Sequence, residues 1–174
     1  MRKVTYRYCL ATNTKEIQAY FDLRHDIFCE EQGLFPESER DEIDGHAYPI
    51  VAVDEVGQVI GVVRIYETES GLWYGGRLGV HRDYRRRGRV GQGLIYKAVT
   101  TAHAWGCHTF LATVQLQNVR FFSRLHWDSL KELTICDRPH HLMQADLDHY
   151  PPILDVRPTR IPLEVNPCAV GFSA

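Results

Sequence analysis

The chain has 174 residues, 44% of them hydrophobic, which suits one domain of ordinary size with a full core. Its formal net charge of −2 lacks the basic excess of a nucleic-acid-binding protein, so no nucleic acid is expected as a partner. No apolar run approaches the roughly 20 residues that a membrane span needs, and the first residues have a β pattern, unlike a signal peptide. We therefore expect a cytoplasmic protein without a membrane segment.

The cysteines are odd in number and lie mostly within apolar runs. This usage is typical of reduced, buried thiols in a cytoplasmic protein and not of a disulfide framework. No paired spacing of Cys or His ligands occurs around His103 or His140, so we expect no bound metal. The five cysteines are Cys9, Cys29, Cys107, Cys136 and Cys168.

The N-terminal part of the chain predicts a strand followed by a helix. Residues 4–10 have a β pattern. Asn13, with Glu16 three residues later, has the pattern of a capping box, so a helix should begin near Thr14. Arg24 interrupts the apolar stripe of this helix, and an arginine on an apolar face has to meet an acid or a polar cleft.

The middle of the chain alternates strands with turns. Three glycines in the strand expected at residues 72–80 indicate bulges or a place where a ligand approaches the backbone. Residues 107–115 have the apolar pattern of a buried parallel strand, and Asn118 precedes a short helix expected at residues 119–127. The remaining strands are expected at residues 47–54 and 58–68, which form a hairpin, and near residues 131–137 and 141–146.

A basic turn connects the strand at residues 72–80 to a helix whose apolar stripe begins at Val90. Gly88 and Gly91 let the backbone approach a ligand, and the free amides and positive dipole end of the helix suit an anion. These features predict a phosphate cradle, and the alternative is a solvated basic turn before an ordinary helix. The arginines that could fork onto phosphate oxygens are Arg85, Arg86, Arg87 and Arg89.

Residues 85–90 of this turn, preceded by Leu78-x-Val80 and Tyr84, resemble the acyl-CoA signature of the GNAT acetyltransferase superfamily. That signature reads Gln/Arg-x-x-Gly-x-Gly/Ala, and Val90 stands at its last position here, with Gly91 following. The resemblance implies an α+β fold, the GNAT acyl-CoA N-acyltransferase fold, with a mixed, mostly antiparallel sheet of six or seven strands flanked by helices. It also implies acetyl-CoA as the acyl donor.

The resemblance covers roughly residues 1–147, so we expect a GNAT N-acetyltransferase domain at residues 1–149. Residues 150–174 are rich in proline and are expected to form an extended tail or a linker. Such a tail could contact a second copy of the chain in a homodimer, or a partner domain.

The resemblance also assigns residues to the donor end of the site. A backbone N–H near Val80 would polarise the thioester carbonyl, and the strand would splay from its neighbour to make room for the thioester. Phe122 stands where many members have the tyrosine that reprotonates the leaving thiolate. The residues expected to bind the cofactor are Leu78, Val80, Arg85, Arg86, Arg87, Gly88, Arg89, Val90, Gly91, Asn118 and Phe122.

The acceptor end is indicated by Arg24, Asp41 and Asp44, whose spacing resembles one GNAT branch and the acyl-homoserine-lactone synthases. In those proteins the matching residues organise the acceptor end of the cleft. By this resemblance Arg24 and Asp44 either bind the substrate or form an internal salt-bridge clasp that shapes the acceptor pocket, and both alternatives remain open.

Acetylation of an amine needs a base that takes a proton from the ammonium form of the acceptor. The candidate bases are Glu67 and Glu69, at the end of the third strand, and His81, just past the fourth strand. His126, which replaces a glycine of the family motif, is the candidate acid. Each of these residues also fits a surface or packing role.

A nearer resemblance, carried by residues 73–80, 114–127 and 140–147, is to the nitrogen-starvation N-acetyltransferases encoded beside bacterial nitrilases. The resemblance implies an acetyl-CoA-dependent N-acetyltransferase that acts on a small amine or amino-acid-like acceptor by direct attack in a ternary complex. Two alternatives remain open. One is a longer-chain acyltransferase related to the acyl-homoserine-lactone synthases, and the other is a non-catalytic acyl-CoA-binding partner subunit.

Overall fold

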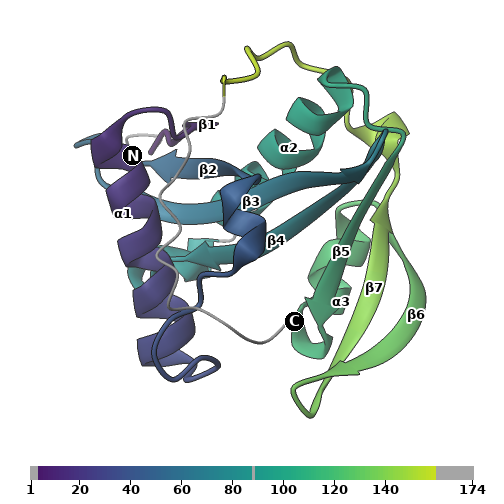
Figure 1. Cartoon of the computed structure of the whole chain (residues 1–174), viewed down its shortest axis with the longest axis horizontal. Helices are drawn as coiled ribbons and strands as arrows, with labels where there is room; N and C mark the ends of the chain where they lie inside the picture. Colours follow the sequence, from purple (N-terminus) through teal and green to yellow (C-terminus); the bar gives the residue numbers. More distant parts are fainter. Residues whose placement is uncertain (1–3, 88, 160–174) are drawn as a thin grey trace.

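The computed structural model describes residues 4–87 and 89–159, without the side chains of Arg86 and Arg87. Gly88 and residues 160–174, with Cys168, lie outside the described residues. The strands are β1 (Arg7–Leu10), β2 (Tyr48–Val53), β3 (Val59–Glu69), β4 (Leu72–Val80), β5 (Thr109–Gln115), β6 (Trp127–Ile135) and β7 (Arg138–Ala145) (Figure 1). The helices are α1 (Thr14–His25), α2 (Arg89–Ala104) and α3 (Leu116–Arg124), with short helical turns η1 (Asp26–Glu31), η2 (Glu42–Gly45), η3 (Arg82–Arg87) and η4 (Leu147–His149).

The described strands form one seven-stranded sheet in the order β1-β2-β3-β4-β5-β7-β6. β4 and β5 pair in parallel, and the other neighbours pair antiparallel. The predicted α+β architecture with a mixed, mostly antiparallel sheet is therefore confirmed. The parallel step arises because the chain crosses from β4 to β5 through α2, as parallel pairing requires a long connection.

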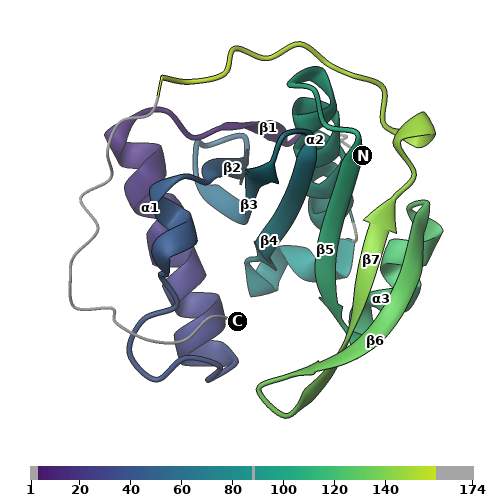
Figure 2. The ribbon, with the colours of Figure 1, turned by 45° about the vertical axis from the view of Figure 1, so that its right-hand side comes forward.

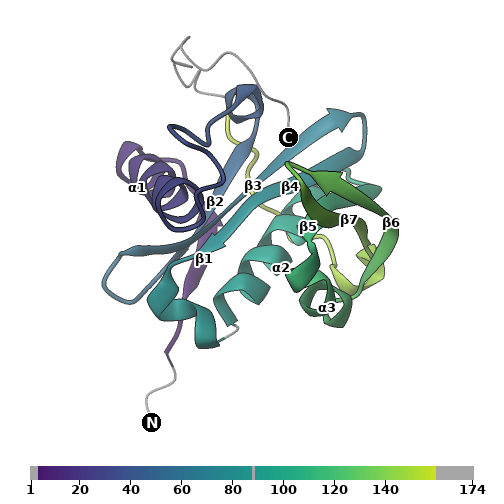
Figure 3. The same ribbon diagram turned by 90° about the horizontal axis from the view of Figure 1, so that it is seen from below.

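Helices cover both faces of the sheet (Figure 3). α1 packs on one face, where Tyr20 and Ile27 join a buried apolar cluster with Val62 of β3. α2 packs on the other face, where Leu94 belongs to a larger cluster with Ile60. The two clusters share β3, which is buried on both faces and has the continuous apolar run expected of a central strand.

α1 begins at the residue that the capping pattern predicts. The side chain of Asn13 accepts a hydrogen bond of 2.9 Å from the N–H of Glu16, and Thr14 is the first helical residue. After His25 the helix continues as the π-helical turn η1, which carries Ile27 and Phe28 onto the sheet.

The short helix after β5 differs from the prediction at both ends. It spans Leu116–Arg124, not residues 119–127, and β6 already begins at Trp127. The helix ends because His126 adopts a φ of +65°, a left-handed conformation that cannot continue an α-helix. His126 therefore lies in the link between α3 and β6.

The cysteines only partly match the expectation of buried thiols. Cys107 is 5% exposed, and burial raises the pKa of its thiol to about 12, so this thiol is unreactive. Cys136 is exposed in the turn between β6 and β7, where the prediction of burial is wrong. Cys9 and Cys29 are half-buried.

The chain after β7 returns over the domain. Tyr150 is 4% exposed and packs in the larger apolar cluster. The described residues 151–159 follow in extended conformation and are bonded to α2, where the side chain of Lys97 pairs with Asp155 at 2.6 Å (Figure 2). Among residues 4–87 and 89–159, the structure has no helix both long and apolar enough to cross a membrane.

Candidate active site

β4 and β5 pair over only three residues before they diverge. Leu72 to Tyr74 lie opposite Thr109 to Leu111, and beyond that point β4 pairs with β3 while β5 pairs with β7 (Figure 2). Residues 75–80 of β4 and 112–115 of β5 therefore face each other without a ladder. Main-chain donors and acceptors on these inner edges are available to a ligand that enters the split.

A β-bulge lies on the β4 side of this split. Arg77 and Leu78 together lie opposite the single residue Val63 of β3, and Arg77 has a φ of +52°. Three glycines in β4 predicted a bulge, yet the left-handed residue is an arginine. Its guanidinium compensates by donating to the main-chain carbonyl of Glu39 at 2.9 Å and to Asp41 at 3.3 Å.

Helix α2 begins directly beyond the split. A Cβ built on Gly91, in the first turn of α2, would lie 3.7 Å from the ring of Phe121 and 3.9 Å from Val80. The first amides of α2 have no partner within the helix, which makes this end a place for an anion. Gly88 lies outside the described residues, so the cradle is defined by its α2 side.

Two arginines of the predicted cradle have partners in the structure. The Nε of Arg85 donates to the carbonyl of Val80 at 2.7 Å, and its Nη2 lies 2.8 Å from the carboxylate of Glu31. Arg85 thus ties the end of β4 to η1. Arg89 is exposed, and its main-chain carbonyl accepts a hydrogen bond from the hydroxyl of Tyr8 at 3.1 Å.

On the α1 face of the sheet, three arginines and three carboxylates form a buried ionic network. Arg24 is fully buried and donates to both oxygens of Asp44, at 2.7 and 3.0 Å, and to Glu39 at 2.8 Å. Arg64 of β3 lies between Asp41, at 2.6 Å, and Asp44, at 3.0 Å. We call this set the clasp, and its members are Arg24, Arg64, Arg77, Glu39, Asp41 and Asp44.

The contacts within the clasp shift the pKa of Asp44. Burial alone would raise the pKa of Asp44, but the hydrogen bonds and charge of Arg24, with the charge of Arg64, outweigh it and hold the pKa below its ordinary value. Each guanidinium is engaged by carboxylates within the protein. Arg24 and Asp44 are thus joined to each other, as the salt-bridge alternative requires, and hold residues 39–44 against the sheet.

The structure separates the candidate catalytic residues Glu67, His81 and His126. Glu67 lies opposite Trp73 at the closed end of the split and accepts from the N–H of Gly71 at 2.9 Å. His81 directly follows β4, and its Nδ1 accepts from the N–H of Asp83 at 3.3 Å. Of the three, only His81 lies beside the start of the cradle.

His126 lies at the far end of α3 from the split. Its ring stacks on His149 with centroids 3.5 Å apart, and its carbonyl accepts from Asp146. The nine residues of α3 span about 13 Å and lead from the open end of β5 back to its closed end. The helix direction, which spacing along the sequence does not reveal, thus places His126 away from the position of the missing tyrosine.

Phe122, which stands at the position of that tyrosine, is 7% exposed and packs edge to face on Trp127 in the core. Its neighbour Phe121 is half-buried and faces Gly91. Asn118 is exposed. The residue that borders the cradle is therefore Phe121. Adjacent residues of a helix point in different directions, so the helical period of α3 could have told Phe121 from Phe122.

Sequence reasoning missed a pair of tyrosines at the vertex of the split. Tyr74 is the last residue of β4 that pairs with β5, and its ring stacks on Tyr66 of β3 at 5.7 Å. His46 packs edge to face on Tyr66. The pairing register of β3, β4 and β5 assembles these groups, so no local motif indicates them.

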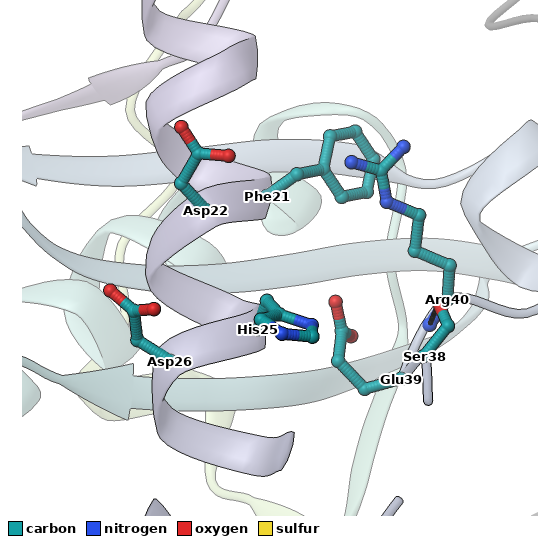
Figure 4. A pocket seen from close by; sticks show the side chains of 7 residues that line it. All are labelled: Phe21, Asp22, His25, Asp26, Ser38, Glu39 and Arg40. Atoms are coloured by element: carbon teal, nitrogen blue, oxygen red, sulfur yellow. Dashed lines mark hydrogen bonds between the residues drawn. The ribbon is translucent and has the colours of Figure 1, made fainter. Parts of the chain in front are cut away.

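A shallow hollow of about 370 Å³ lies on the outer side of the clasp. α1 supplies one wall and residues 38–40 the other, and the Arg40 guanidinium lies 3.8 Å from the ring centroid of Phe21 (Figure 4). Glu39 lines this hollow and also binds Arg24, so the hollow borders the clasp and not the cradle. The seven lining residues are Phe21, Asp22, His25, Asp26, Ser38, Glu39 and Arg40.

Comparison with known proteins identifies the family. The sequence model of the acetyltransferase (GNAT) family matches residues 14–127, which include β4, the cradle and α3. The chain belongs to the acetyltransferase (GNAT) family. It is 30% identical over 140 residues to the uncharacterized N-acetyltransferase YjcF of Bacillus subtilis (strain 168), covering 79% of this chain and 97% of that protein.

Solved structures share the GNAT fold. A crystal structure of a Lactobacillus plantarum protein assigned to the N-acetyltransferases has a TM-score of 0.74 and 20% identity, with 80% of this chain and 97% of that chain covered. Escherichia coli ElaA has a TM-score of 0.71 and 21% identity, with 83% and 100% covered. The predicted GNAT fold and enzyme class are confirmed. The nearer resemblance to nitrogen-starvation enzymes remains a prediction.

Proposed function

We propose that this GNAT enzyme transfers the acetyl group of acetyl-CoA to a small amine or amino-acid-like acceptor, by direct attack within a ternary complex. The observation that carries the proposal is the split between β4 and β5, which opens beside the first turn of α2. A donor that carries a diphosphate at one end and a thioester at the other matches this arrangement. The start of α2 suits the diphosphate, and the unpaired main chain in the split suits the thioester.

The donor end of the site fits acetyl-CoA in its chemistry. The amides at the start of α2 would receive the diphosphate, and Gly91 leaves space that a side chain would fill. Val80 and Phe121 border that space with apolar surface, which suits the pantetheine arm. Arg85 would have to leave Glu31 to bind the donor. The other residues predicted from the sequence to bind the cofactor remain predictions, namely Leu78, Arg86, Arg87, Gly88, Arg89, Val90, Asn118 and Phe122.

The chemistry would take place on the inner edge of β4. A main-chain N–H near Val80 would polarise the thioester carbonyl while the acceptor nitrogen attacks the carbonyl carbon. A C–N bond forms and the C–S bond breaks, so the amine loses a proton and the leaving thiolate gains one. We propose His81 as the base, because it directly follows Val80 at the open end of β4, and its protonated ring as the group that returns the proton to the leaving thiolate.

A longer-chain acyltransferase is the second candidate. The buried Arg24–Asp44 pair favours it, because the spacing of these residues resembles the acyl-homoserine-lactone synthases. Arg24 and Asp44 would then shape the acceptor side through the clasp. The cytoplasmic location, the homodimer or partner domain, and the boundary at residue 149 remain predictions from the sequence.

Calorimetric titration with acetyl-CoA and a free-thiol assay on a panel of amines test the proposal. Gly91→Leu should weaken acetyl-CoA binding at least tenfold, because its side chain fills the space between Val80 and Phe121. Gln92→Leu, at the adjacent exposed position of α2, is the matched control and should bind as the wild type does.

Three outcomes contradict the assignment in different ways. Unchanged binding by Gly91→Leu rejects the cradle. Binding without thiol release on any amine, with any acyl donor, rejects transfer and leaves the non-catalytic acyl-CoA-binding subunit. Release only with longer acyl donors supports the second candidate over acetyl transfer.

A further inference from the structure

Three aromatic rings from separate elements lie together beneath one cation at the closed end of the sheet, and the side chain of this cation is 39% exposed. The guanidinium carbon of Arg157 lies 5.3 Å from the ring centroids of both Tyr48 and Trp73, and 5.5 Å from that of Trp105. Tyr48 opens β2, Trp73 lies in β4 and Trp105 follows α2. This geometry is that of an aromatic cage for a cation.

Polar contacts complete the cage. The Nε of Arg157 donates to the hydroxyl of Tyr48 at 2.8 Å, and its Nη2 lies 3.3 Å from the carboxylate of Glu67. Tyr48 and Trp73 are 6% and 0% exposed, so two of the three rings belong to the folded core. The cage is thus built by the domain and filled by the segment that follows it.

The segment around Arg157 is held by polar anchors. Leu154 and Val156 are 91% and 84% exposed, while the alternate residues Asp155 and Arg157 contact the domain. The indole N–H of Trp105 donates to the carbonyl of Asp155 at 2.8 Å. Because its large apolar side chains point outward, burial of apolar surface contributes little to docking.

We propose that Tyr48, Trp73, Trp105 and Glu67 form a binding site for a guanidinium or methylated ammonium group, occupied in cis by Arg157. Residues 151–157 are then a strap that this site latches onto the closed end of the β4–β5 split. The fit follows from the chemistry, since a planar, weakly hydrated cation stacks on ring faces and its N–H groups reach a hydroxyl and a carboxylate.

The site predicts that an external cation can replace Arg157. In a ¹H–¹⁵N NMR spectrum of the full chain, the indole signals of Trp73 and Trp105 should move in Arg157→Gln, while that of Trp127 stays. Methylguanidinium at millimolar concentration, at matched ionic strength, should return the two signals toward their wild-type positions along a saturable curve. In the wild type the same titration should leave them in place, because the cage is filled.

Controls separate the cage from general effects of charge. Arg138→Gln removes an exposed arginine of β7 and should leave the indole signals of Trp73 and Trp105 unmoved. Arg157→Lys keeps the charge without the planar fork, so smaller shifts than in Arg157→Gln are expected. Unmoved indole signals in Arg157→Gln overturn the latch. Shifts in that variant without saturable recovery by methylguanidinium overturn the cation site.

Discussion

At the scale of single residues, the clasp shows how a charged side chain becomes part of a core. Arg24 interrupts an apolar helix stripe, and the structure supplies acceptors for it from Glu39 and Asp44. A buried charge is tolerated when it is paired and hydrogen-bonded, but removing one partner leaves the others uncompensated. The clasp therefore contributes to stability mainly through the cost of breaking it.

Replacing Arg24 with methionine should lower the free energy of unfolding by about 3–5 kcal/mol, since Asp44 and Glu39 then remain buried without their partner. Urea denaturation measures the change. Arg7→Ala is the control: Arg7 pairs with Glu16 on the surface, at 3.3 Å and 60% side-chain exposure, and such pairs contribute about 0–1 kcal/mol. Equal losses in the two variants would refute a buried clasp.

Acid should weaken the protein partly through Asp44. Because the folded pKa of Asp44 is lowered, its contribution is fully present above the unfolded pKa of about 3.9 and is lost as pH falls through the folded value. The wild type should therefore lose stability below pH of about 4 more steeply than Asp44→Asn, although that variant is weaker at neutral pH. Urea midpoints across pH 2–7 provide the measurement, and parallel curves would contradict the assignment.

At the scale of elements, glycines set how closely helices approach the sheet. A Cβ on Gly61 of β3 would lie 2.8 Å from Leu94 and 2.9 Å from Val90, both in α2. These contacts at Gly61 thus fix the distance between the first turn of α2 and β3. Because the amides of that turn belong to the proposed cradle, packing at Gly61 would also position the proposed donor site.

Gly61→Val should push α2 from the sheet, lower the free energy of unfolding by about 1–3 kcal/mol and weaken acetyl-CoA binding. Thermal denaturation and calorimetry measure the two effects. For the change in stability, Gly91→Ala is the matched control in the same helix, since its Cβ meets only ordinary contacts at 3.7 Å and beyond. A Gly61→Val protein with wild-type stability would show that α2 is not held in this way.

At the scale of the whole molecule, the sheet is continuous at one end and divided at the other. β4 and β5 pair with each other at Trp73 and Phe110 in the core. Beyond Tyr74 and Leu111 the two strands continue but no longer pair with each other. Each half of the sheet keeps its own support, β3 for β4 and β7 for β5. The split is therefore a stable feature of the fold, with main-chain groups exposed on its edges.

Acetyl-CoA should slow amide hydrogen exchange in residues 75–80 of β4 and in the first turn of α2, because a bound donor occupies those N–H groups. Mass spectrometry of peptic peptides with and without acetyl-CoA gives the measurement. β2, which pairs with β3 along its length and with β1 over residues 50–53, serves as the internal reference and should not change. Protection confined to other parts of the chain would place the donor elsewhere.

Predictions that rest on neighbouring residues agree with the structure better than those that depend on contacts between distant parts of the chain. Local signals performed well: the cap at Asn13 placed the start of α1, and the glycine-bearing turn after β4 led into α2 as expected. Glu67 and His126 were chosen by their place along the chain, and the structure puts both at the closed end of the split. Pairing register and helix direction decide such positions.

The sequence by itself determined the α+β class and the order of strands and helices, because these depend on periodicity and on residues close in the chain. The tertiary structure alone decided that Arg24 meets Asp44, that Tyr74 reaches the vertex of the split, and that Arg157 enters a cage of three rings. Those contacts join residues far apart in sequence, and only packing of the sheet and its helices brings them together.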